Sequence, residues 1–348
     1  MFSEHGGDAF GLDILYDFSA NLNPLGMPEA AKKMLKKSVT EWEKYPDPSC
    51  RKLTQKLAAA MDLRPEQIVC GNGAADLIYR IISTIKPRKC VLCSPTFSEY
   101  EKALRENNCE IEYFPLLEEN DFRLDERISE TLTNGAEMLI LCNPNNPAGG
   151  VISRELLKKI CEKCAQKNIT FLCDECFLEF TENAENNSAL NFLNEKTIVL
   201  KAFTKIFAMA GIRLGYAVFG DCETARKTAQ SGQCWSVSAP AQIAGTAVLD
   251  DEIGTEIYLE KTRELIKAER EFLKKSLNDL GIRTFDSSAN FLLLKSDLQL
   301  FDALLEKRIL IRNCANFRGL DERFFRIAVR THEENQALVE ALRRVIGG

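Results

Sequence analysis

Short apolar segments that alternate with helical patterns constrain the fold of this chain more than any other feature. They lie at residues 68–70, 90–93, 138–142, 170–173 and 197–200. Near-continuous apolar strands separated by helices are typical of a parallel sheet covered by helices on both faces. A polar cluster follows each segment, so the clusters should converge on one edge of the sheet. The sequence therefore predicts an α/β fold with a mostly parallel sheet between helices.

The length of the chain indicates more than one domain, because 348 residues exceed the usual size of a single core. Residues 1–35 are rich in polar and glycine-containing turns, and we expect an N-terminal arm that packs with the small domain. We expect residues 36–245 to form the large domain. A long helical pattern, short strands and a final helix with the capping box Thr331-His332-Glu333-Glu334 predict a small α+β domain at 246–348.

The charge of the chain argues against large anionic partners. The net charge is -6, and no block of lysine and arginine is present, so we expect no nucleic-acid or membrane partner. Acidic residues interrupt the first twenty positions, and no segment is apolar enough to span a bilayer. These features predict a cytoplasmic protein with a small-molecule ligand.

Thirteen cysteines raise the question of a metal site, since three pairs have CxxC spacing: 90/93, 161/164 and 173/176. The pairs fall on different predicted elements. The two histidines, His5 and His332, lie at opposite ends of the chain. We therefore expect buried thiols in a reducing compartment rather than a structural zinc or iron–sulfur site.

Residues 200–216 place Lys205 just past an apolar strand and Arg213 eight residues later. Phe203, Phe207 and Met209 would desolvate the lysine, which lowers its pKa and frees the amine to form a Schiff base with a carbonyl. Arg213 could pair with an anionic group of a cofactor. A surface lysine and a structural arginine are the alternative.

Other loops at the same edge carry further candidates. The amides of residues 73–75 (Gly-Ala-Ala) open a helix and suit a phosphate. Asp174 could hold a protonated ring nitrogen, Asn146 could donate to a phenolic oxygen, and Phe97 could stack on a flat ring. Taken singly, each has a structural alternative: a plain helix start, a capping aspartate, a turn asparagine and a core phenylalanine.

The order of these motifs resembles the fold-type I, pyridoxal-phosphate-dependent aminotransferase superfamily, in its histidinol-phosphate aminotransferase-like branch. The motifs are Tyr45-Pro46, Ser94-Pro95-Thr96-Phe97, Asn143 to Pro147, Asp174-Glu175 and Thr204 to Gly215. The resemblance implies pyridoxal 5'-phosphate as cofactor, with Lys205 and Asp174 as catalytic residues. It also implies a homodimer in which Tyr45 reaches the partner's site. The implied cofactor-binding residues are Gly73, Ala74, Ala75, Phe97, Asn146, Asp174, Phe177, Thr204, Lys205, Arg213 and Tyr45.

Within this branch the chain is most similar to the L-threonine-O-3-phosphate decarboxylases of cobalamin biosynthesis, through residues 5–7, 18–28, 235–237 and 309–321. Phe177 stands where aminotransferases of the branch typically have tyrosine. The resemblance implies decarboxylation of O-phospho-L-threonine to (R)-1-amino-2-propanol O-2-phosphate. The arginines have the bidentate geometry that suits a carboxylate and a phosphate. The candidate substrate-binding residues are His5, Asn21, Arg312, Arg326 and Arg330.

Two alternatives stay open at this point. One is a histidinol-phosphate or aromatic amino-acid aminotransferase that uses 2-oxoglutarate. The other is a non-catalytic pyridoxal-phosphate sensor domain. The chain also departs from the family pattern at Ala148, Lys201 and Ala202, where threonine, arginine and a hydroxyl residue are common. These departures bear on how tightly the cofactor phosphate is held.

Overall fold

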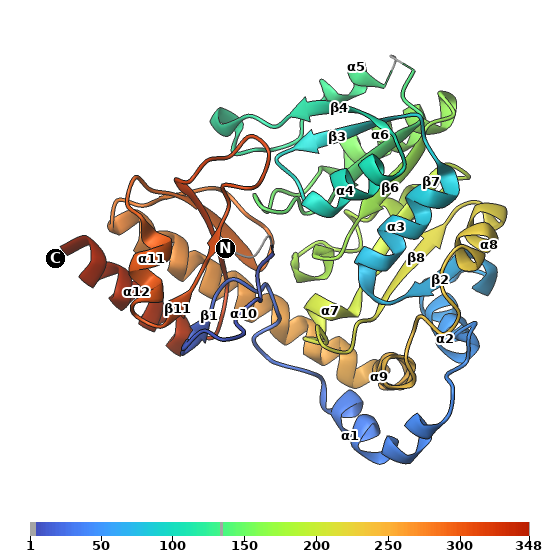
Figure 1. Ribbon diagram of the computed structural model, residues 1–348, viewed down its shortest axis with the longest axis horizontal. Coiled ribbons are helices and arrows are strands. Elements are labelled where there is room, and N and C mark those ends of the chain that lie inside the picture. Colours follow the sequence, from blue (N-terminus) through green and yellow to red (C-terminus); the bar gives the residue numbers. More distant parts are fainter. Residues whose placement is uncertain (1–4, 133–134, 348) are drawn as a thin grey trace.

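The computed structural model describes residues 5–132 and 135–347, and a large and a smaller part lie side by side in it (Figure 1). The large part contains a seven-stranded sheet in the order β2-β8-β7-β6-β5-β3-β4. Its strands are β2 (Ile68–Gly71), β3 (Lys89–Ser94), β4 (Glu110–Pro115), β5 (Met138–Cys142), β6 (Thr170–Asp174), β7 (Thr197–Ala202) and β8 (Gly215–Phe219). All neighbours from β4 to β7 are parallel, and only the pairs that involve β8 are antiparallel. The predicted α/β fold with a mostly parallel sheet is confirmed.

Strands β4 and β8 were not predicted. Strand β4 lies at the edge of the sheet, where charged and partly exposed residues interrupt the apolar run. Strand β8 starts at Gly215, where a Cβ atom would lie 2.6 Å from the backbone nitrogen of Ala74. The glycine is therefore required for close packing between this strand and the start of α3.

Several helices pack directly against this sheet. Ser153 caps α6, because its side chain accepts a hydrogen bond from the backbone nitrogen of Leu156. Helix α1 (Glu29–Lys37) lies at the end of the arm, and the helices of the large part are α2 (Arg51–Met61), α3 (Gly73–Ile85), α4 (Ser98–Glu106), α5 (Ile128–Thr131), α6 (Arg154–Gln166), α7 (Phe203–Ile206), α8 (Cys222–Gln230) and α9 (Ala239–Asp250).

The long helix α10 (Glu252–Asp279) runs from beside α9 to the small part (Figure 1). There a four-stranded antiparallel sheet has the order β12-β13-β10-β9. The remaining elements are β9 (Arg283–Thr284), β10 (Phe291–Lys295), α11 (Leu300–Leu305), β11 (Ile309–Leu310), β12 (Arg312–Asn313), β13 (Phe324–Ala328) and α12 (His332–Gly347). The capping box before α12 is confirmed. The Glu334 carboxylate accepts from the Thr331 nitrogen at 3.1 Å, and the Glu334 nitrogen donates to the Thr331 hydroxyl.

The arm contacts both parts of the molecule. Strand β1 (Tyr16–Asp17) pairs in parallel with β11 of the small part, whereas α1 packs against α9 of the large part. The proposed division at residues 35 and 245 stays a prediction. Along residues 5–132 and 135–347, no helix has both the length and the apolar character to cross a bilayer.

The cysteines of the CxxC pairs are all buried, and each pair belongs to a different element: β3, α6 and the end of β6. Within the described ranges, no group of three or more histidine, cysteine or acidic side chains could hold a metal ion. Cys222 and Cys234 are the more accessible thiols among the described residues.

Candidate active site

A cavity of about 380 Å³ lies at the carboxyl ends of the central strands, between the arm, the large part and the small part. It brings together most of the residues that the sequence indicated. Those that line it are His5, Asn21, Ala74, Ala75, Phe97, Asn146, Asp174, Phe177, Thr204, Lys205, Arg213, Arg312 and Arg326.

One end of the cavity suits a phosphate. Helix α3 begins there at Gly73, and its first backbone N–H groups have no partner within the helix. The Arg213 guanidinium lies 2.8 Å from the position of a Cβ at residue 73, and φ of Gly73 is +81°. Residue 73 must therefore be glycine for the arginine to approach the start of the helix. Thr204 adds a hydroxyl to the lining.

Asp174 lies at the end of β6 and is almost fully buried. Its Oδ2 accepts a 2.6 Å hydrogen bond from the Tyr100 hydroxyl, and its Oδ1 accepts from the Cys176 backbone nitrogen at 3.0 Å. Burial raises the pKa of this carboxyl, while hydrogen bonds from the Cys176 thiol, the Tyr100 hydroxyl and the Cys176 backbone nitrogen act in the opposite direction. In the described part of the chain Asp174 has no ion-pair partner, so its site favours a cationic group of a ligand.

Lys205 follows β7 in the single turn of α7, next to the buried Phe203 and Ile206. Its side chain lines the cavity. Burial lowers its pKa to about 8, and the positive charges of Arg326 and Arg213 act in the same direction. The amine is therefore neutral in part near physiological pH, as a carbonyl-reactive lysine must be.

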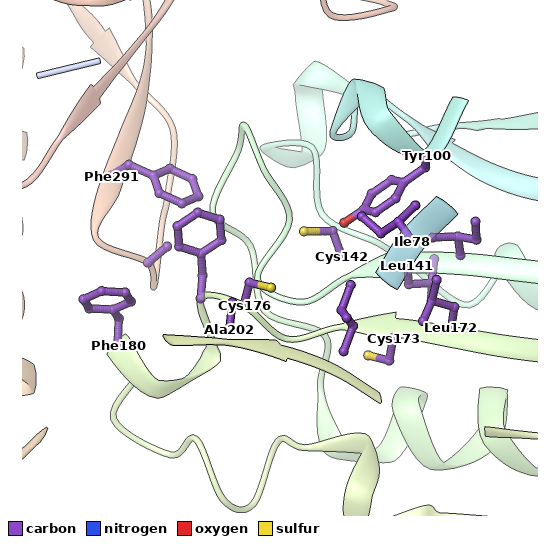
Figure 2. Packing of buried hydrophobic residues seen from close by; sticks show 14 of the residues in the cluster. Ile78, Tyr100, Leu141, Cys142, Leu172, Cys173, Cys176, Phe180, Ala202 and Phe291 are labelled. Atoms are coloured by element: carbon purple, nitrogen blue, oxygen red, sulfur yellow. The ribbon is translucent and has the colours of Figure 1, made fainter. Parts of the chain in front are cut away.

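Aromatic rings form the walls between these groups. Phe97 directly precedes α4 and meets Tyr100 edge-on, with ring centroids 5.5 Å apart. Phe177 meets Phe291 edge-on at 5.1 Å. Figure 2 shows the buried side chains around the site, with the Tyr100 hydroxyl directed toward the sulfur of Cys142.

Two buried arginines from the small part complete the cavity. Arg326 donates to Asn146 Oδ1 and, at 3.0 Å, to the Ser19 carbonyl. Burial lowers the pKa of Arg326 to about 10, so it stays cationic. Arg312 donates to Asn316 Oδ1 at 2.6 Å. Asn21 Oδ1 is buried and has no hydrogen-bond partner among the described residues. This donor-rich, positively charged end suits an anionic ligand.

Three predicted residues lie elsewhere or at the margin. His5 is half-exposed, and its Nε2 lies 2.8 Å from Glu99 Oε1 at the rim. Arg330 is not among the lining residues, because its guanidinium holds Glu334 at 2.6 Å beside the α12 capping box. Tyr45 is 80% exposed and stacks on Trp235 at 4.5 Å, outside the cavity of its own subunit.

Eight lining residues were not among the predicted site residues, namely Gly6, Ser19, Ala20, Glu99, Tyr100, Cys142, Cys176 and Phe317. Tyr100 had a usable signal, since it lies one helical turn after Phe97 and therefore on the same face. For Cys142 and Cys176 the only signal in the sequence was their position at or near the end of a predicted strand.

Comparisons with known proteins agree with this geometry. The family described as aminotransferase class I and II matches residues 13–342. The threonine-phosphate decarboxylase of Salmonella typhimurium is 36% identical, over 99% of this chain and 97% of the relative. The adenosylcobalamin biosynthesis bifunctional protein CobDQ of Leptospira interrogans is 33% identical, over 99% of this chain and 41% of the relative. The crystal structure of the histidinol-phosphate aminotransferase from Clostridium acetobutylicum has a TM-score of 0.88 at 31% identity, covering 96% of this chain and 99% of that chain.

Proposed function

The chain belongs to the class I and II aminotransferase family, and from this premise we propose that it decarboxylates O-phospho-L-threonine for cobalamin biosynthesis. The observation that carries the proposal is the pair of buried arginines, Arg312 and Arg326, in the same cavity as Lys205. Two buried cations exceed the need of one carboxylate and suit a substrate with a carboxylate and a phosphate.

The described residues fit pyridoxal 5'-phosphate. Arg213 and the start of α3 offer an anion site, and Asp174 offers a buried carboxylate with no ion-pair partner among the described residues. The cofactor, when bound, supplies an electron sink for a bond that breaks at the α-carbon of an amino acid. We assign its phosphate to Arg213 and α3, its ring nitrogen to Asp174, its ring face to Phe97 and its covalent attachment to Lys205.

The arginines decide which bond at the α-carbon breaks. Arg312 and Arg326 would hold the carboxylate and the phosphate of the substrate, and these two contacts would set which bond at the α-carbon is aligned for cleavage when the cofactor is bound. The carboxylate would leave as carbon dioxide, and Lys205 in its protonated form would supply the proton that replaces it at the α-carbon. The product is (R)-1-amino-2-propanol O-2-phosphate. Phe177 cannot donate a hydrogen bond here, unlike the tyrosine typical of aminotransferases of the branch.

Product analysis tests this proposal against an aminotransferase. We expect carbon dioxide from O-phospho-L-threonine and no glutamate from histidinol phosphate plus 2-oxoglutarate. Brisk glutamate formation without carbon dioxide would show that the chain is an aminotransferase. A protein that binds the cofactor but gives neither product would fit the sensor-domain alternative.

Arg312→Gln is expected to raise the KM for O-phospho-L-threonine about ten- to a hundredfold, because a charge-assisted contact to an anion is lost. Arg323→Gln is the matched control, since Arg323 is exposed and pairs with Asp321 outside the cavity. Steady-state rates of carbon dioxide release measure both variants. An equal KM in Arg312→Gln and Arg323→Gln would exclude Arg312 from substrate binding.

We also propose a cytoplasmic homodimer in which Tyr45 reaches the site of the partner subunit. The exposed stack of Tyr45 on Trp235 supports this, because large exposed aromatic pairs mark interaction surfaces. Light scattering should give the mass of two chains. A mixture of Tyr45→Ala and Lys205→Ala subunits should regain activity that neither has alone, since one hybrid site is intact. Failure of this complementation in a proven dimer would refute the shared site.

A further inference from the structure

Tyr100 is a buried residue whose hydroxyl forms a hydrogen bond with Asp174, the carboxylate of the site. The side chain is fully buried, and the hydroxyl donates to Asp174 Oδ2 at 2.6 Å. The second carboxylate oxygen accepts from the backbone nitrogen of Cys176 at 3.0 Å. The Cys176 thiol also forms a hydrogen bond with this carboxylate. Asp174 still lines the cavity.

The phenol and the thiols whose pKa values respond to the charge of Asp174 are all neutral. They are Tyr100 from α4, Cys142 from β5, Cys173 from β6 itself and Cys176 from the turn after β6. Burial, aided by the negative charge of Asp174, raises the pKa of all four, so each keeps its proton. The cations that line the same cavity are Lys205, Arg213, Arg312 and Arg326, and none forms an ion pair with Asp174 in the described ranges.

We propose that Tyr100 is a positioning residue that keeps the Asp174 carboxylate ionised and directed toward the ring nitrogen of bound pyridoxal 5'-phosphate. This inference rests on the proposed function. A short hydrogen bond from a neutral phenol stabilises a carboxylate in a buried site, where no charged partner does so. Phe97 directly precedes α4 and Tyr100 lies in its first turn, so one helix start supplies both the ring wall and the donor to Asp174.

The expected pH dependence has a definite sign. Removal of the donor raises the pKa of Asp174 further, because burial then acts with less opposition. Below that pKa the carboxyl is neutral and cannot attract a protonated ring nitrogen. The affinity for the cofactor should therefore fall on acidification, and the fall should begin at a higher pH without the phenol.

The test compares two ligands in three proteins. After removal of the cofactor, dissociation constants for pyridoxal 5'-phosphate and for its 1-deaza analogue are measured across acidic and neutral pH. The analogue keeps the aldehyde and the phosphate but lacks the ring nitrogen. The proteins are the wild type, Tyr100→Phe and the control Tyr113→Phe, whose hydroxyl contacts Arg105 at 3.3 Å outside the cavity. Thermal unfolding checks that each variant is folded.

We expect Tyr100→Phe to weaken binding of pyridoxal phosphate about ten- to a hundredfold at the acidic end, the size of a lost hydrogen bond to a charged group. Binding of the deaza analogue should not change, and Tyr113→Phe should match the wild type for both ligands. Incorporation of 3-fluorotyrosine at position 100 provides a second variant with nearly the same packing. The fluorine makes the phenol a stronger hydrogen-bond donor. The pH at which the affinity for pyridoxal phosphate begins to fall should therefore be lower than in the wild type.

If Tyr100→Phe weakens the binding of both ligands equally, Tyr100 has a packing role only, and the inference is overturned. So would an unchanged preference for the ring nitrogen in a folded Tyr100→Phe protein, which would leave the proposed function intact. If the wild type itself shows no preference for the ring nitrogen, the assignment of Asp174 fails, and the inference fails with it.

Discussion

Replacing Lys205 with alanine is expected to lower the rate of carbon dioxide release from O-phospho-L-threonine by about 10⁴-fold. The Lys205 amine lines the cavity, and burial brings its pKa to about 8. An amine that is neutral in part can both attach the cofactor and transfer a proton to the α-carbon. Alanine can do neither, although Arg213 and Asp174 would still bind the cofactor without a covalent bond.

Single-turnover carbon dioxide release and the visible absorption of the covalently attached cofactor measure this effect. Lys167→Ala is the matched control, because Lys167 is exposed just after the end of α6 and does not line the cavity. It should keep both the rate and the absorption. A Lys205→Ala protein that retains the absorption band would remove the covalent role of Lys205, and a rate within about tenfold of the wild type would remove its role in proton transfer.

The central strands and the strand-end residues could be predicted because their signals are local. Strand β5 is fully buried, and an apolar run of this length between two helical patterns is typical of a central strand. Lys205, Asp174 and Asn146 directly follow such runs, so the topology alone brings them to one edge of the sheet. Strand β8 has an apolar run of the same kind but was not predicted, and its place beside α3 depends on the close approach of Gly215 to that helix.

The contacts of long side chains could not be predicted in the same way. The sequence alone does not distinguish Arg326 from Arg330 as a binding residue. In the structure Arg326 lies within β13 and lines the cavity. Arg330 lies past the end of that strand and is held by Glu334. The capping box could be predicted from the sequence. The ion pair between its Glu334 and Arg330 could not, because it depends on how the two side chains lie in space. The partner contact proposed for Tyr45 depends on a second subunit and stays a prediction.

Lys201, which departs from the arginine common in the family, lies in a buried ionic network behind the site. Its amine is 3.2 Å from Glu175 Oε2 and 2.6 Å from Glu179 Oε1. Glu175 is fully buried and also accepts from Ser188 and from the Ala189 nitrogen. Burial alone would lower the pKa of Lys201, but the two carboxylates outweigh burial and raise it well above its ordinary value. Lys201 is therefore the cation that compensates Glu175.

Lys201→Met is expected to lower the free energy of unfolding by about 3–5 kcal/mol at neutral pH, because a buried carboxylate loses its cation. Burial already raises the pKa of Glu175 above its unfolded value, so the folded protein takes up this proton more readily than the unfolded chain. The difference in unfolding free energy between the wild type and Lys201→Met should therefore become smaller as the pH falls and Glu175 becomes protonated.

Urea unfolding at neutral and acidic pH measures the deficit, with Lys267→Met as control. Lys267 pairs with Glu182 at the surface, so its loss should cost only about 0–1 kcal/mol. The double variant Lys201→Met with Glu175→Gln should recover part of the deficit, because it removes the uncompensated charge. If Lys201→Met and Lys267→Met lose the same unfolding free energy, the buried network stabilises the protein no more than a surface ion pair does. A confirmed loss of stability would also show why lysine can replace arginine at position 201. The position requires a buried cation, and the carboxylates of Glu175 and Glu179 are close enough to keep a lysine charged.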